Sequence, residues 1–348
     1  MQNGYVFKFL KRPDPKDIDE PMYLHSRNTY LHELCSKGAP LHLIEEAVRD
    51  LGANVDCINE RGLTPLAIAV QENDKEMVAC LLRLRAQICV EIEKGKFCNV
   101  VALSIYLDRP DILDHLLKNN GGYFINTPHS KNEKMGDLPP LAIAAEKKLH
   151  HLIDTLVRAG AFLGRESGQN GYTSLMRAAE SGDIRTITGL LIAGARPNQK
   201  HSKTGLAALH MAINATKSDD VISTLLKWGA DPNQESDDGD TPLMMAAMKA
   251  DKSAMEVLIS YGAYVNHRRH KDGQTPLHGA AGRYLYGAYH IETLLGAGAD
   301  PLITDVFNRT AAKIAFENSH RANLEKLEEA EKSAAQIRAD AAYKKHKK

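Results

Sequence analysis

Short clusters of apolar residues recur in pairs along most of this chain, with turn residues between them. The unit that starts at Gly239 shows the pattern best, with Leu243 in a first apolar cluster and Leu258 in a second. Each cluster is spaced like the inner face of a short helix. The segment 239–247 recurs 34 residues later as 273–281. A fixed period near 33 residues predicts a stack of small paired-helix units rather than one globular core.

The predicted helix ends carry residues that helix ends favour. Thr241 can cap the first helix of its unit through the hydroxyl, and Pro242 follows in the first turn, where a missing N–H costs nothing. Gly262 ends the second helix, as expected for a residue in the left-handed conformation. The same signals predict about nine units along the chain, with Arg85 in place of the closing glycine in the second unit.

The combination of Gly-x-Thr-Pro-Leu, paired helices and a closing Gly-Ala pair resembles the ankyrin repeat over roughly residues 28 to 320. The closing glycines are Gly160, Gly194, Gly229, Gly262 and Gly298. The resemblance implies an all-α fold, an ankyrin-repeat solenoid of helix–turn–helix units with β-hairpin fingers, here with a C-terminal helical extension. It also implies a scaffold or adaptor that binds another protein through its fingers and through a groove along the first helices.

Irregular copies of the repeat suggest internal boundaries. Residues 88–100 alternate apolar and polar positions around a Lys-Gly turn and predict a true β-hairpin, and the link 121–137 is long and polar. We therefore expect an N-terminal segment over 1–27, about three degenerate repeats over 28–136, about six repeats over 137–320, and a charged C-terminal helix and tail over 321–348.

Composition narrows the class of partner. Lys+Arg and Asp+Glu both total 44, so no net charge favours nucleic acid or a membrane surface. No apolar run approaches the ~20 residues that span a bilayer, and residues 1–27 lack the apolar core of a secretory signal. The five cysteines are odd in number and scattered, which favours a reducing compartment. We expect an intracellular, cytoplasmic, monomeric protein whose partner is another protein, with no nucleic acid and no membrane insertion.

Candidate catalytic residues are few. The chain has no phosphate-binding loop, nucleophile elbow or dinucleotide fingerprint. His32 lacks the second histidine of a zinc-protease helix, and Cys35 falls where such repeats carry a packed alanine. Cys89 and Cys98 flank the predicted hairpin, but a metal site needs two more ligands. We expect no enzyme, cofactor or metal. An enzyme, or an enzyme-targeting subunit, with a cryptic catalytic element in 1–136 stays open as the alternative.

The predicted fingers alternate in charge. One carries Lys200, His201 and Lys203, the next carries Glu235, Asp237, Asp238 and Asp240, and the third carries His267, Arg268, Arg269, His270 and Lys271. Ion pairing between fingers and a patterned partner site are equally favoured interpretations. In the eighth unit an extended turn holds an arginine and three tyrosines, a composition typical of interface hot spots, although tyrosines can also simply cover such a turn.

The resemblance adds groove positions on the first helices. The predicted partner-binding residues are Asp237, Asp238, Asp240, Met248, Lys249, His267, Arg268, Arg269, Lys271, Arg283, Tyr284, Tyr286 and Tyr289.

Two further resemblances concern regulation and origin. Asn198, Asn233 and Asn266 occupy the position that an asparaginyl hydroxylase modifies in some ankyrin-like proteins. The glutamates between 328 and 331, ahead of a polar tail, resemble the export signal of type IV effectors from intracellular bacteria. A translocated effector acting in a host cell is therefore one interpretation of the chain.

Overall fold

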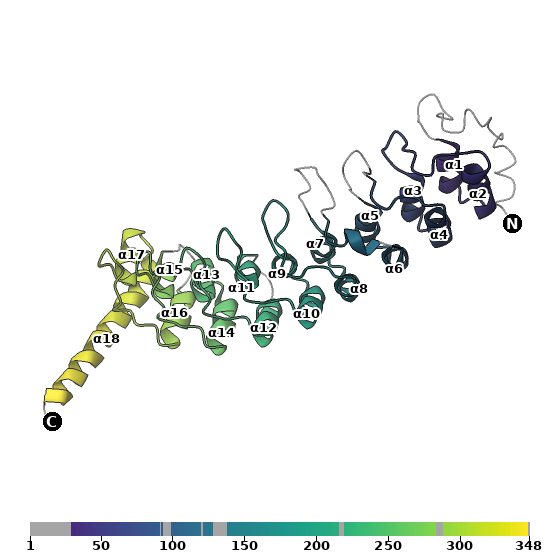
Figure 1. Cartoon of the computed structure of the whole chain (residues 1–348). Coiled ribbons are helices and arrows are strands. Elements are labelled where there is room, and N and C mark those ends of the chain that lie inside the picture. Colours follow the sequence, from purple (N-terminus) through teal and green to yellow (C-terminus); the bar gives the residue numbers. More distant parts are fainter. Residues whose placement is uncertain are drawn as a thin grey trace. The chain divides into compact units, whose positions relative to one another are not determined.

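The computed structural model describes residues 29–90, 92, 99–119, 121–127, 138–215, 219–282 and 288–346. Within these ranges it contains eighteen α-helices and no strand (Figure 1). The chain divides into two compact units, Met1–Ser174 and Leu175–Lys348. Most of the hairpin predicted over 88–100 lies outside the described residues, as do 128–137. The domain division at 136 therefore stays a prediction.

The first unit consists of four successive helix pairs. Its helices are α1 (Tyr30–Ser36), α2 (Leu41–Arg49), α3 (Pro65–Gln71), α4 (Lys75–Arg83), α5 (Val100–Tyr106), α6 (Pro110–Lys118), α7 (Pro140–Glu146) and α8 (Ile153–Arg158), with short 3-10 turns at Gly121–Phe124 and His150–Leu152. The first helices α1, α3, α5 and α7 pack side by side, and α2, α4 and α6 form a second row. The third repeat, within the range expected to be degenerate, forms the helix pair α5 and α6.

The second unit continues the same pattern from within α9. Its helices are α9 (Ser174–Ser181), α10 (Ile184–Ile192), α11 (Ala208–Asn214), α12 (Asp219–Lys227), α13 (Pro242–Lys249), α14 (Lys252–Ser260), α15 (Pro276–Ala281), α16 (Tyr289–Gly296), α17 (Ala311–Glu317) and α18 (Arg321–His346). The first helices α11, α13, α15 and α17 pack in one row, and α10, α12, α14, α16 and α18 pack in another.

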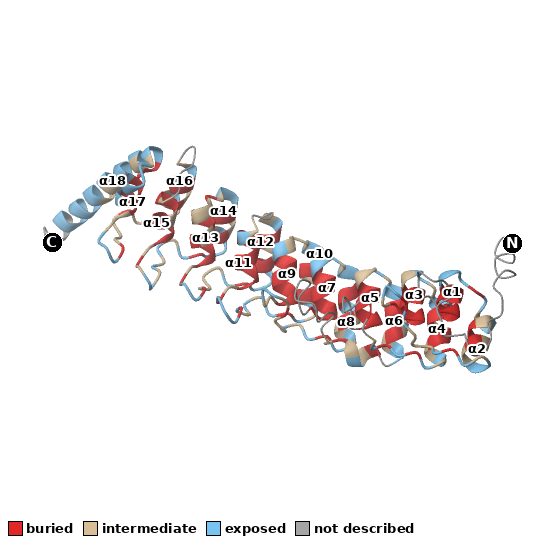
Figure 2. Cartoon of the chain, turned by 90° about the horizontal axis from the view of Figure 1, so that it is seen from above, coloured by how far each residue is buried: buried red, intermediate tan, exposed pale blue. Residues whose placement is uncertain are grey.

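Small apolar residues allow the first helices to pack closely. In α13, Leu243, Ala246 and Ala247 are fully buried, and the same face is buried in the neighbouring first helices (Figure 2). Removing a leucine side chain from water stabilises a fold by roughly 1.5–3 kcal/mol. As predicted, Thr241 caps α13, because its hydroxyl accepts a hydrogen bond from the Met244 N–H at 3.3 Å. Pro242 occupies the first helical position.

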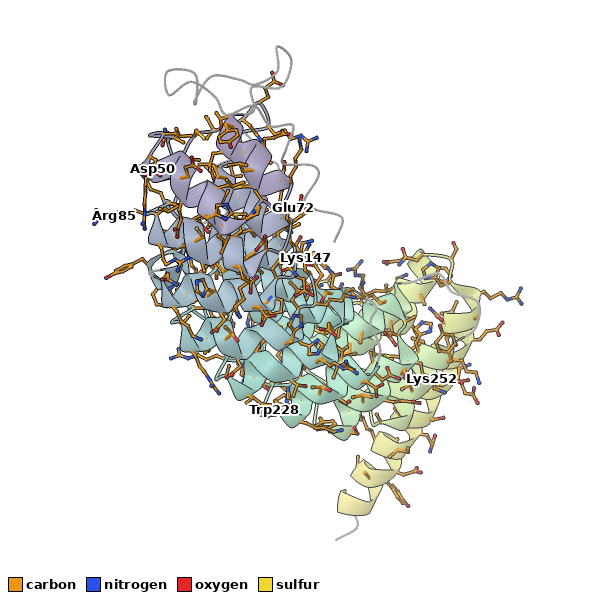
Figure 3. The ribbon with its side chains drawn as sticks, turned by 90° about the vertical axis from the view of Figure 1, so that its right-hand side faces the viewer. Asp50, Glu72, Arg85, Lys147, Trp228 and Lys252 are labelled. Carbon is orange, nitrogen blue, oxygen red and sulfur yellow. The ribbon has the colours of Figure 1, made fainter. Side chains whose placement is uncertain are left out.

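The second helices end on residues with a left-handed backbone. The predicted closing glycines have φ between +85° and +97°, with Gly229 at the lower and Gly194 at the upper value. Arg85 takes the same role at φ +69°, a conformation that costs a non-glycine residue about 1 kcal/mol or more. Its side chain is exposed at the edge of the molecule (Figure 3). The substitution therefore preserves the turn at a cost in stability.

Buried histidines tie three of the first helices, α1, α11 and α15, to the finger that follows. In the first unit the Nε2–H of His32 donates to the Leu63 carbonyl at 2.9 Å. In the second unit His278 donates to the Arg309 carbonyl at 3.0 Å. His32 therefore has a structural role in the repeat.

In several repeats an asparagine makes a second link to the neighbouring repeat. Asn233 donates to the Gly262 carbonyl at 3.0 Å and accepts from the Tyr264 N–H at 2.6 Å. Asn198 and Asn266 form the same two bonds with their own neighbouring repeats. These side chains fasten successive repeats together.

The last helix, α18, packs against α16 and α17 and then becomes mostly exposed. Leu327 is fully buried, and Lys326 lies 3.1 Å from Glu292 of α16. The later turns of α18 are exposed, as Figure 2 shows. Within the described ranges, none of the helices has the length and apolar character needed to cross a membrane.

Candidate partner-binding surface

Four fingers project between the helix pairs of the second unit. We define them as the first (201–206), second (236–240), third (269–274) and fourth (305–309) fingers. In each, the first residue's N–H donates to the last residue's carbonyl, at 2.8, 3.0, 2.8 and 2.9 Å respectively. The expected hairpins are therefore tight turns, each closed by one such bond.

Neighbouring fingers are bonded to one another. The Asp237 N–H donates to the Thr204 carbonyl at 3.0 Å, which joins the first two fingers. The Val306 N–H donates to the Asp272 carbonyl at 2.8 Å, which joins the last two. Side chains of the second and third fingers complete the series. We call this connected row the finger ledge.

Arg269 is the main link between the second and third fingers. Its guanidinium lies 2.5 Å from Asp240 and forms two bonds with Asp272, at 2.9 and 2.7 Å. The bond to Asp272 raises the pKa of Arg269, and the same bond lowers the pKa of Asp272. Only 17% of the Arg269 side chain is exposed, so this predicted contact residue is largely occupied within the fold.

Two further contacts join these two fingers or the residues just before them. Glu235 lies beneath two histidines, with one carboxylate oxygen 3.3 Å from His267 Nε2 and the other 2.5 Å from His270 Nε2. Lys271 lies 3.4 Å from Asp238, and both side chains are largely exposed. An exposed pair of this kind contributes roughly 0–1 kcal/mol, so Lys271 and Asp238 can exchange partners at low cost. Pairing between fingers therefore accounts for much of the alternating charge.

The predicted groove residues lie at the end of α13. Lys249 donates to the Asn214 carbonyl at the end of α11, at 2.6 Å. Met248 is half-buried and packs on Gly279 of α15, so closely that a Cβ on Gly279 would lie 2.9 Å from Met248 Cγ. Methionine is flexible and polarisable, and such side chains adapt to different contacts. Met248 thus presents a deformable apolar position near the C-terminal end of α13, between α13 and α15.

The tyrosine-rich turn is only partly described. Arg283, Tyr284 and Tyr286 lie outside the described residues. Tyr289 begins α16, is 38% exposed and donates to the Ala250 carbonyl at 3.4 Å. This placement beside α13 fits both interpretations of the turn, as an interface hot spot and as a simple cover for the inserted residues.

The fourth finger holds two apolar side chains that the sequence analysis missed. Val306 is 60% exposed and Phe307 is 68% exposed. The tips of the other three fingers carry polar residues such as Lys203, Asp238 and Lys271 at exposed positions. The sequence did contain a sign of this exposed apolar pair, because Val306 and Phe307 lie next to each other among otherwise polar finger residues.

The candidate catalytic residues are structural in this fold. Cys35 is buried in α1, and burial, the largest cause, raises the pKa of its thiol far above the usual range, which disfavours the nucleophilic thiolate. Cys98 lies outside the described residues, so its pairing with Cys89 stays untested. Within the described part of the chain, no three His, Cys, Asp or Glu residues form a group that could hold a metal ion.

Family models identify the repeats. A model of three successive ankyrin repeats matches residues 209–305, and a single ankyrin-repeat model matches residues 61–91. The chain therefore contains ankyrin repeats, and the predicted repeat fold is confirmed. The longer match contains the second and third fingers together with α13 and α15.

Two curated relatives contain similar segments. A fowlpox virus protein named as an ankyrin repeat protein, FPV031, is 30% identical over 155 residues, covering 43% of this chain and 44% of the relative. The mouse B-cell lymphoma 3 protein homolog is 29% identical over 180 residues, covering 51% of this chain and 39% of the relative. The chain thus spans less than half the length of these relatives.

A solved structure has the same fold. The crystal structure of the ankyrin repeat domain of Bcl-3, a member of the IkappaB protein family, is 24% identical, with a TM-score of 0.57. The alignment covers 66% of this chain and 97% of that domain. At this identity the likeness concerns the fold alone.

Proposed function

We propose that this chain is a non-enzymatic interaction scaffold that binds a partner protein through the finger ledge and the adjoining first-helix face of its second unit. Ankyrin-type arrays present extended surfaces for binding other macromolecules. The observation that carries the proposal is the bonding of each finger to the next, through Asp237, Arg269 and Val306. A surface ordered before association loses less conformational freedom when a partner binds.

Site-specific photo-crosslinking tests which face binds. A photoreactive amino acid is placed at Asp237 or Lys271 on the finger ledge, or at Lys252 or Glu256 on α14. All four side chains are exposed. The variants are incubated with cell lysate, and crosslinked proteins are identified by mass spectrometry. We expect one protein to crosslink from the two ledge positions and not from the two α14 positions. The same protein crosslinking only from α14 would overturn the proposal.

The location of the protein and its role in a cell also belong to this proposal. A cytoplasmic location and a translocated effector role in a host cell stay predictions from the sequence. For the alternative of a cryptic catalytic element in residues 1–136, the two candidates named from the sequence, Cys35 and His32, both have structural roles.

A further inference from the structure

The tips of the third and fourth fingers combine exposed apolar and cationic side chains. Val306 and Phe307 are 60% and 68% exposed, side by side at the tip of the fourth finger. The Arg309 guanidinium lies 5.1 Å from the centroid of the Phe307 ring. Large apolar side chains at a turn tip add little to folding, because they stay in water there. Their burial by a partner would be favourable.

Arg268 lies beside Val306. A Cβ on Gly273 would lie 3.1 Å from the Arg268 guanidinium and 3.5 Å from a Val306 methyl group, so both side chains cover the same glycine. Arg268 also donates to the Thr304 carbonyl at 2.9 Å. The charge is thereby held next to the apolar pair while the rest of its guanidinium stays exposed.

The third and fourth fingers carry more cations than carboxylates of their own. The third and fourth fingers with the residues just before them contain Arg268, Arg269, Lys271 and Arg309 against only two carboxylates. One of these, Asp272, is bonded to Arg269, and the other, the buried Asp305, is bonded to Arg309 at 2.8 Å. Arg268, which lies just before the third finger, and Lys271, whose pair with Asp238 of the second finger is largely exposed, are therefore the exposed cations beside the two tips.

The backbone of the fourth-finger tip is held by several hydrogen bonds. The carboxylate of Asp305 accepts bonds from the N–H groups of Phe307 and Arg309, both at 2.9 Å. The Val306 N–H is bonded to the third finger at Asp272. Phe307 is thus presented by a backbone that is bonded on both sides. A preordered aromatic residue beside fixed cations is a composition typical of binding hot spots.

We propose that the tips of the third and fourth fingers form a docking site for an acidic peptide segment of the partner, one that carries a large apolar side chain next to its carboxylates. The inference rests on the proposed function and names the chemistry of the partner at that surface. The apolar side chain packs on Val306 and Phe307, and the carboxylates face Arg268 and Lys271. The acidic second finger, with Asp237 and Asp238, repels the same segment and so fixes its direction along the ledge.

A random peptide library tests this chemistry without knowledge of the partner. Twelve-residue peptides displayed on phage are selected against the full chain, then synthesised with a fluorophore and titrated by fluorescence polarisation. We expect the selected peptides to carry one aromatic or large aliphatic residue within a few positions of at least two carboxylates. Affinity should fall several-fold between 50 mM and 500 mM salt, because the recognised charges are exposed.

Matched variants locate the binding site. Phe307→Ala and Arg268→Ala should each weaken binding by about tenfold, the effect of removing a hot-spot side chain. Phe316→Ala and Arg321→Ala are the controls. Phe316 is 61% exposed and, like Phe307, lies 5.1 Å from a cation, Lys313, while Arg321 is exposed on α18. The control variants should bind within twofold of the parent, and all four should keep its thermal unfolding midpoint within a few degrees.

Three results would overturn the docking site. These are a library that yields no binding peptide, selected peptides that are basic or uncharged, and acidic peptides whose affinity is unchanged by Phe307→Ala and Arg268→Ala. Direct binding of single-stranded RNA or of anionic vesicles that Arg268→Ala weakens, with no peptide selected, would assign the tips to a different partner class. In each case crosslinking from Asp237 and Lys271 reports separately on the proposed scaffold function.

Discussion

Gly239 and Arg269 meet across the second and third fingers. A Cβ on Gly239 would lie 3.0 Å from Arg269 Cγ and 3.6 Å from the backbone nitrogen of His270. Gly239 also has φ +82°, in the left-handed region that glycine adopts without strain. The recurrent glycine of this repeat therefore has two roles: it allows the turn and it lets the next finger approach.

Replacing Gly239 with alanine should cost more than backbone strain alone. Gly262 is a control with nearly the same backbone, φ +87°, and no heavy atom within 4 Å of its missing Cβ. Gly262→Ala should destabilise the chain by about 1 kcal/mol through strain. Gly239→Ala should lose about 1 kcal/mol more, because Arg269 has to move. Urea unfolding measures both values, and equal losses would contradict a close approach of the fingers.

Arg269 should affect folding, and Lys271 should not. Both belong to the third finger and both contact an aspartate of the second finger, so they form a matched pair. Arg269→Ala leaves Asp240 and Asp272 without their shared cation and should cost about 2 kcal/mol. Lys271→Ala should change the free energy of unfolding by less than about 0.5 kcal/mol, since its pair is exposed. A double change of Arg268 and Arg269 to glutamate is therefore a poor test of binding. It would alter the proposed docking site at Arg268 and also damage the fold at Arg269.

Stability should fall as the pH is lowered from 6.5 towards 4. Burial, the largest cause, lowers the pKa of His210 from 6.5 to about 4, and burial also lowers the pKa of His278. The folded pKa lies below the unfolded one, so the unfolded chain takes up the extra proton in this window. His210 thus contributes stability that is complete above pH 6.5 and is lost on acidification, by about 3 kcal/mol in all.

His210→Gln separates this effect from the titration of carboxylates. Glutamine has an amide to donate to the Asp240 carbonyl, which His210 Nε2 contacts at 3.3 Å, but it does not titrate. Urea unfolding at pH 7.5, 6 and 5 should show a weaker pH dependence for this variant than for the parent. Parallel curves would show that His210 is not the responsible group.

Local signals made the repeat fold predictable. Thr241, Pro242 and Gly262 act within a single unit, so the sequence around each one predicts its role. Arg85 shows the limit of such signals, because its left-handed backbone is imposed by the repeat and not by residue type.

The details of the finger ledge depend on contacts between repeats. From the sequence, several acidic residues of the fingers could have paired with Arg269. The structure shows that Asp240 and Asp272 are its partners. Phe307 was overlooked because an apolar residue between helices is usually packed, whereas here it lies at a turn tip. The groove positions Met248 and Lys249 and the turn at Tyr289 stay predictions for partner binding.

Cysteine labelling distinguishes the scaffold from the cryptic-enzyme alternative. Cys35 is buried with a strongly raised thiol pKa, whereas Cys89 is exposed. Iodoacetamide at pH 7.5 should therefore modify Cys89 in the native chain and leave Cys35 unmodified until urea unfolds it, because alkylation requires an accessible thiolate. Peptide mapping by mass spectrometry follows both residues in one sample. Modification of native Cys35 at least as fast as Cys89 would identify an activated thiol and support the catalytic alternative in residues 1–136.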